Sequence, residues 1–157
     1  MGLNQFGRLL ALAALTSSIT LAAPAMAALG GSVDSVSADS TVFRGQLRST
    51  PLLQYDIHEI THGELIVREY VSRTGQVFAV TWQGPIPPDL RQLLGSYFGR
   101  FQTAAAASHQ SNPGIHRRLS ISQSDLVVES TGRLRAFHGV AYLPSLLPAG
   151  VSVSELQ

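Results

Sequence analysis

The 157-residue chain has no cysteine and no lysine, and only 13% of its residues are charged. Without cysteine the fold cannot rely on disulfides, and a lipid anchor attached to a cysteine is excluded. If Arg8 is set aside, ten arginines balance ten acidic residues. A balanced charge provides no electrostatic footprint for nucleic acid or for an anionic membrane, so neither is predicted as a partner.

The first 27 residues have the pattern of a secretory signal peptide. Arg8 precedes an apolar run from Leu9 to Ala23, and Ala25-Met26-Ala27 supplies small residues at the two positions that a signal peptidase reads. Cleavage is therefore predicted after Ala27. The apolar run is too short for a membrane anchor, so the mature chain is expected to have no transmembrane segment and to be exported to the periplasm or the medium.

The mature chain suits one domain with a useful core. Residues 28–50 are rich in Gly, Ser and Asp and are predicted to form a flexible or short-helical lead before a single domain over 51–157. Near Leu53 the hydrophobic pattern takes a period of two, which continues through 65–71 and 77–82. These segments, separated by Gly turns, predict a three-strand antiparallel meander. In its third strand, Phe78, Val80 and Trp82 are expected to share one face.

A helix is predicted from Pro88 to about Ala106. Its apolar residues step by three and four and form one stripe: Leu90, Leu93, Leu94, Tyr97, Phe98 and Phe101. Short strands are predicted over 119–122, 126–130 and 134–142, with a hairpin turn at Thr131-Gly132. The expected fold class is α+β, an antiparallel sheet with the long helix packed on one face.

The stretch "DIHEITHGEL" contains His58-Glu59-Ile60-Thr61-His62, which spells the zinc-protease signature H-E-x-x-H. Zinc proteases need the two histidines one helical turn apart, whereas the β-branched residues and the adjacent Gly63 predict a strand that ends in a turn here. A turn could still bring the two histidines together. On a strand, residues four apart are separated by about 13 Å, and Glu59 points to the opposite face. We therefore predict no metal or catalytic site. The alternative is a metal site formed by His58, Glu59 and His62.

Two other groups are weaker candidates. His109 and His116 flank a Pro-Gly loop that could gather metal ligands, although isolated histidines in a polar loop are more often solvated. Arg117 and Arg118, together with Arg133 and Arg135, could form a basic patch if their strands are neighbours, but a solvated sheet face is the favoured interpretation. No nucleophile elbow, phosphate loop or dinucleotide fingerprint is present, so no cofactor is predicted.

The stretch "VREYVSRTGQVFAVTWQGPIPPDLRQLLGSYF", from Val67 to Phe98, resembles the DUF2844 family of small exported bacterial proteins. The mature start "ALGG" (28–31) and the strand Ile57-His58-Glu59-Ile60 are also similar to the family pattern, to which the second histidine of HEITH does not belong. The resemblance covers most of the mature chain. It implies export in Gram-negative bacteria and brings no activity.

The leading hypothesis is an exported, non-enzymatic module that binds a partner protein or another envelope component. It rests on a complete small core without a catalytic constellation. One alternative is a metal-dependent hydrolase that uses His58, Glu59 and His62, which metal analysis would distinguish. Another is a small-ligand carrier with its ligand between helix and sheet, which native mass spectrometry would detect.

Overall fold

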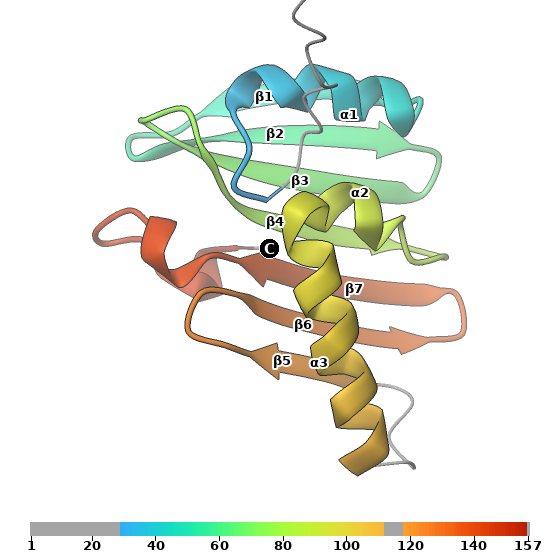
Figure 1. Ribbon diagram of the computed structural model, residues 1–157. Coiled ribbons are helices and arrows are strands. Elements are labelled where there is room, and N and C mark those ends of the chain that lie inside the picture. The colour runs from blue at the N-terminus through green and yellow to red at the C-terminus, as the bar shows by residue number, and fades with distance from the viewer. Residues whose placement is uncertain (1–28, 112–117, 157) are drawn as a thin grey trace, which may run out of the picture.

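A single antiparallel sheet of seven strands forms the centre of the molecule, in the order β1-β2-β3-β4-β7-β6-β5 (Figure 1). The structure, a computed structural model, describes residues 29–111 and 118–156. The strands are β1 (Gln46–Pro51), β2 (Tyr55–His62), β3 (Leu65–Ser72), β4 (Val77–Gly84), β5 (Arg118–Ser122), β6 (Val127–Arg133) and β7 (Ala136–Tyr142). An antiparallel sheet with helices agrees with the predicted α+β class, although most of the regular structure is strand.

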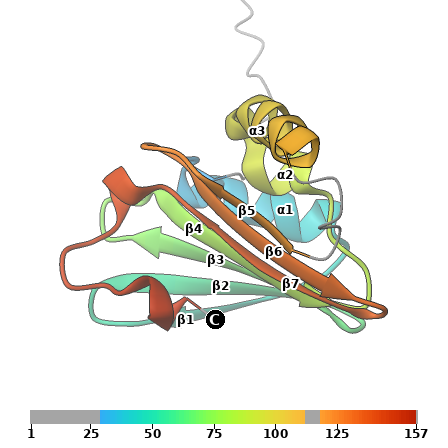
Figure 2. The same ribbon diagram turned by 90° about the horizontal axis from the view of Figure 1, so that it is seen from below.

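The two faces of the sheet are covered differently (Figure 2). One face, called the helix face below, carries α1 (Val36–Val42), α2 (Leu90–Leu94) and α3 (Phe98–Ser111). The other, called the open face, carries part of the C-terminal segment, Leu147–Leu156, with its short 3₁₀ turn η4 (Val153–Glu155). Three further 3₁₀ turns are η1 (Val33–Ser35), η2 (Gly95–Tyr97) and η3 (Pro144–Leu146).

Each face has its own apolar core. The helix-face core brings Leu93 and Leu94 of α2 against Val80 and Trp82 of β4, all at most 2% exposed. The open-face core is smaller and aromatic: the rings of Tyr55, Tyr70 and Phe78 lie 5.7–6.2 Å apart and pack under the C-terminal segment.

The predicted flexible or short-helical lead contains more structure than its composition indicates. Residues 28–50 hold η1, α1 and most of β1, so the meander has four strands rather than three. Before α1, the backbone is tied to the domain: Gly30 N–H donates to Val77 O at 2.8 Å, and Leu29 N–H donates to Leu93 O at 3.0 Å. Residues 29–42, called the N-terminal strap below, are therefore part of the domain.

The predicted long helix is interrupted. Asp89 caps α2 by accepting from Arg91 N–H at 2.8 Å, but Gly95 adopts φ +49° and ends α2 after five residues. The chain then turns through η2 into α3. A positive φ costs glycine far less than other residues, so Gly95 explains why the stripe does not continue along one straight helix. Phe98 is consequently only partly buried.

A β-bulge corrects the predicted face of Phe78. Tyr70 pairs with Ala79 and Val71 pairs with Val77, so Phe78 is an extra residue in β4. The bulge places Phe78 in the open-face core, while Val80 and Trp82 remain on the helix face. The alternation rule fails here because one inserted residue reverses the faces on either side of it.

The last hairpin also differs from its prediction. β6 continues through Thr131 and Gly132 to Arg133, which pairs with Ala136, so the turn is Leu134–Arg135. Arg135 has φ +61°, and Leu134 is 95% exposed.

Candidate binding groove and buried acid pair

A groove of about 940 Å³ lies on the part of the open face at the β2–β3 turn, where β4 ends and β7 begins. Its walls come from β3, β4, β7, β6 and the start of β5. By register, the side chains of Arg68, Thr81, His138, Thr131 and Arg118 share this face. Buried Leu156 of the C-terminal segment also lines it. The C-terminal segment covers only part of the open face, and this concave region lies beside it.

Two cations in this groove have no acidic partner within ion-pair distance among the described residues. The ion pairs among the described residues join Arg68 to Glu59, Arg73 to Asp56 and Arg100 to Asp125. Arg118 of β5 and Arg135 of the β6–β7 turn both line the groove and belong to none of these pairs. The acidic side chains that line the groove are Glu64 and Glu129.

Hydrogen-bonding side chains also line the groove. His138 Nε2 and Thr131 Oγ1 are 2.6 Å apart across the β6–β7 pair. Gln83 and Thr81 of β4 add an amide and a hydroxyl. Such a mixture of cations, hydroxyls and amides can orient an acidic, polar ligand, because guanidinium groups match carboxylate and phosphate geometry.

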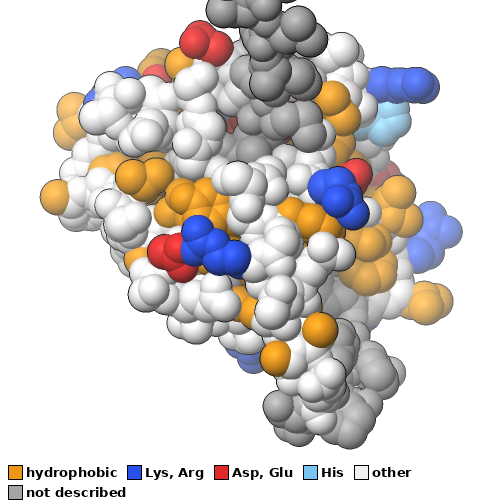
Figure 3. Space-filling view, viewed as in Figure 1, with side chains coloured by type: hydrophobic (Ala, Val, Ile, Leu, Met, Phe, Trp, Pro, Cys, Tyr) orange, Lys and Arg blue, Asp and Glu red, His pale blue; other side chains and the backbone are white. Residues whose placement is uncertain are grey.

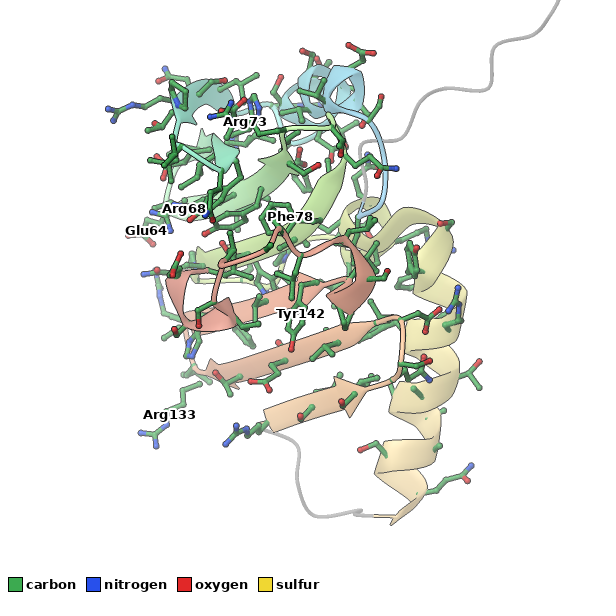
Figure 4. The ribbon with its side chains drawn as sticks, turned by 90° about the vertical axis from the view of Figure 1, so that its left-hand side faces the viewer. Glu64, Arg68, Arg73, Phe78, Arg133 and Tyr142 are labelled. Atoms are coloured by element: carbon green, nitrogen blue, oxygen red, sulfur yellow. The ribbon has the colours of Figure 1, made fainter. Side chains whose placement is uncertain are left out.

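The structure brings together part of the predicted basic patch. Arg118 and Arg135 line the groove. Arg133 lies on the same face by register, but its side chain projects beyond the end of the sheet (Figure 4). In the same view, Glu64 and Arg68 lie nearer to β2 and β3. Arg117 lies outside the described residues. On the helix side, the charged residues are scattered and form no patch of one sign within the described surface (Figure 3).

The H-E-x-x-H stretch lies on β2, and its three side chains have separate partners. His58 Nδ1 is 2.8 Å from Ser49 Oγ, and His62 Nδ1 is 3.0 Å from the Arg44 carbonyl oxygen. Glu59 accepts from Arg68 Nε at 2.7 Å on the open face. Within residues 29–111 and 118–156, no group of three or more His, Cys, Asp or Glu side chains is placed to hold a metal ion.

The remaining predicted positions are placed as follows. His109 lies in α3, whereas His116 and the cleavage site after Ala27 lie outside the described residues. The proposed carrier site between helix and sheet is occupied by side chains of the helix-face core, and the groove opens on the opposite face.

A cluster that the sequence did not predict lies beneath α1. Asp39 of α1 and Glu69 of β3 are both 0% exposed. Gln92 of α2 donates from Nε2 to Asp39 Oδ1. His58 of β2 is the cross-strand partner of Glu69, and its Nε2 is buried without a hydrogen bond. The cluster thus collects polar groups from four elements inside an apolar core.

Burial dominates the ionisation of this cluster. Burial raises the pKa of Glu69 to about 9, and the neighbouring Asp39 carboxyl adds to this through hydrogen bonding and through its charge. Burial also raises the pKa of Asp39, against the lowering effect of its contacts with Glu69 and Gln92. Burial lowers the pKa of His58, so the imidazole next to the pair is neutral at pH 7. Glu69 is therefore protonated at neutral pH.

Sequence comparison matches residues 25–156 to the model of a family described as Protein of unknown function (DUF2844). The chain belongs to the DUF2844 family. This confirms the resemblance drawn from the central block, and the match includes both the N-terminal strap and the C-terminal segment. No curated protein and no solved structure matches the chain.

The fold described for this DUF2844 protein contains no helix, within its described residues, long and apolar enough to cross a membrane. The family description assigns no activity.

Proposed function

We propose that this DUF2844 protein is an exported, non-enzymatic binding module that holds an acidic envelope component in the groove of its open face. The observation that carries the proposal is the pair of arginines, Arg118 and Arg135, that line one groove and have no acidic partner within ion-pair distance in residues 29–111 and 118–156. Guanidinium groups form charge-assisted hydrogen bonds with carboxylate or phosphate, so an acidic ligand would complete this site.

A ligand that lies on the face of a sheet is recognised by side chains rather than by backbone groups. The backbone groups of β3, β4, β7 and β6 are already paired with neighbouring strands, so a peptide backbone finds few partners over them. Thr131, His138 and Gln83 instead offer side-chain donors and acceptors. An acidic molecule rich in hydroxyl groups, such as an acidic polysaccharide, fits this chemistry.

Export is supported by the apolar run from Leu9 to Ala23 and the small residues before Ala28. N-terminal sequencing of the protein recovered from the cell envelope or medium tests it. The expected sequence begins at Ala28, and an intact Met1 in the cytoplasmic fraction contradicts export without affecting the binding proposal.

Binding is tested by following backbone amide signals in a nuclear magnetic resonance titration with oligogalacturonate, inorganic phosphate and a neutral oligosaccharide. We expect oligogalacturonate to shift signals at Thr131, Arg135 and His138, and the neutral sugar to leave them unchanged. A response to phosphate alone would identify a phosphate-bearing ligand.

The matched variants are Arg118→Gln and Arg133→Gln, which remove the same charge inside and outside the groove. Loss of the acidic response in Arg118→Gln but not in Arg133→Gln supports the site. Equal weakening in both variants, or an equal response to the neutral sugar, refutes specific binding in the groove.

A further inference from the structure

Besides its backbone hydrogen bonds to the domain, the N-terminal strap meets the sheet at a buried acid pair that contains no cation. Asp39 and Glu69, both fully buried, come from α1 and from the centre of the meander. Asp39 Oδ2 and both carboxyl oxygens of Glu69 are buried, and none has a partner among the described residues that meets hydrogen-bond geometry. Two buried carboxylates without a counter-ion repel each other and lose their hydration, so one proton must remain between them.

The surroundings of the pair supply no positive charge to replace that proton. From α2, Gln92 contributes a neutral amide. From β2, His58 is neutral because burial lowers its pKa, and Asp56 of the same strand is paired with Arg73. Arg68, adjacent to Glu69 in β3, lies on the open face with Glu59. The pair thus has no alternative means of neutralisation among these neighbours.

Of the two elements that hold the pair, α1 is the more weakly attached. It has seven residues, too few for a helix to be stable alone, and it buries only Val36 and Asp39. β3, in contrast, pairs with β2 and β4 along its whole length. Charge repulsion between the carboxyl groups will therefore be relieved by movement of α1 before the sheet opens.

We propose that Asp39 and Glu69 form a proton-dependent latch, in which one shared proton holds α1 on the sheet and its loss releases α1 while the sheet stays folded. The step is a simple ionisation: hydroxide removes the proton from the pair as water, leaving two carboxylates that face each other. This inference is independent of the proposed ligand site, which lies on the opposite face.

Hydrogen-exchange mass spectrometry of the mature protein at pH 7 and pH 10 tests the latch, with rates divided by the intrinsic rate at each pH. We expect protection of 36–43 to fall at least tenfold at pH 10, while 77–84 in β4 stays protected. Glu69→Gln keeps the shape but cannot ionise, and it should retain protection of 36–43 at both values. Unchanged protection of 36–43 in the parent at pH 10, or an equal loss in the variant, overturns the proposal.

A second measurement needs no variant. The infrared spectrum of the parent should contain a carbonyl band from a buried, protonated carboxyl group at pH 7, and this band should disappear as the pH is raised past about 9. Absence of the band at pH 7 means that the pair is already ionised, and the latch is then wrong even if Glu69→Gln does not fold.

Discussion

On the helix face the carboxyl group of Glu69 is buried with no cation, whereas on the open face Glu59, one strand away, forms an ion pair with Arg68 at 2.7 Å. Both residues belong to the same meander. The difference arises from what covers each face. Helices α1 and α2 exclude water from Glu69, while the side chains of Glu59 and Arg68 are each 28% exposed and remain hydrated.

This contrast separates two uses of a polar residue on a sheet. On the helix face, polar groups must satisfy one another, so they fix how the strap docks. On the open face, Arg118 and Arg135 line a groove in which an acidic ligand can approach them. The covered face therefore concerns the assembly of the fold, whereas the uncovered part of the open face is where we propose that a ligand binds.

The largest expected effect comes from the covered part of the open face. Phe78→Ala removes a fully buried ring from the aromatic core beneath the C-terminal segment. Such a truncation costs about 3–5 kcal/mol of unfolding free energy. Urea unfolding followed by the fluorescence of Trp82 measures it, with the exposed Leu134→Ala as control. Equal midpoints for the two variants would show that the C-terminal segment does not cover a core.

The second effect is a pH dependence of stability that we expect from Glu69 and not from Glu59. The pKa of Glu69 is raised from its ordinary value of 4.5 to about 9, so the folded state holds an extra proton between these values. Stability is therefore greatest at acidic pH and is lost as the pH rises towards 9. We expect the free energy of unfolding to fall as the pH rises through this range, with a slope of at most about 1.4 kcal/mol per pH unit for this one proton.

Urea midpoints at pH 5, 7 and 9 measure this dependence in three proteins. Glu69→Gln should flatten the decline, because the amide cannot ionise. Glu59→Gln should keep it, since that carboxylate lies in a partly exposed pair on the other face. A decline that persists unchanged in Glu69→Gln would assign the pH dependence to other groups.

A smaller effect is expected at Gly139, where the ring of Trp82 leaves little room for a side chain. A Cβ on Gly139 would overlap the ring of Trp82 and lie 2.6 Å from the Glu129 carbonyl oxygen. Gly139→Ala should therefore destabilise the fold by about 1–3 kcal/mol. Gly99→Ala in α3 meets no atom within 4 Å and should stabilise the fold by roughly 0.5–1 kcal/mol. Thermal unfolding distinguishes the two, and the same sign for both would contradict the packing described.

Much of the sheet could be predicted because its central strands carry a period-two pattern. β2, β3 and β4 were expected from alternation, and the strand positions of His58 and His62 followed from the same reasoning. β1 was missed because its residues are all exposed and leave no apolar alternation. The bulge at Phe78 was missed because a register shift depends on the partner strand, which a local pattern does not describe.

The sites were less predictable than the strands. Asp39 lies in a polar segment that has the composition of a surface, and its partner Glu69 is 30 residues away along the chain. One signal was present: Glu69 stands between Val67 and Val71 on the apolar face of its strand, where a carboxyl group requires a partner. The groove depends on the pairing of β4 with β7, which joins segments more than 50 residues apart.

The smallest expected effect concerns the stability of the groove. Arg118→Gln combined with Arg135→Gln removes two exposed cations that have no ion pair among the described residues. The free energy of unfolding should therefore stay within about 0.5 kcal/mol of the parent value. Arg68→Gln, which breaks the pair with Glu59, should cost up to about 1 kcal/mol. Urea unfolding at pH 7 makes the comparison. If the double variant is the less stable of the two, these arginines support the fold, and their positions no longer favour a ligand site. If its stability is unchanged, a loss of acidic-ligand binding in the same variant reports on recognition alone.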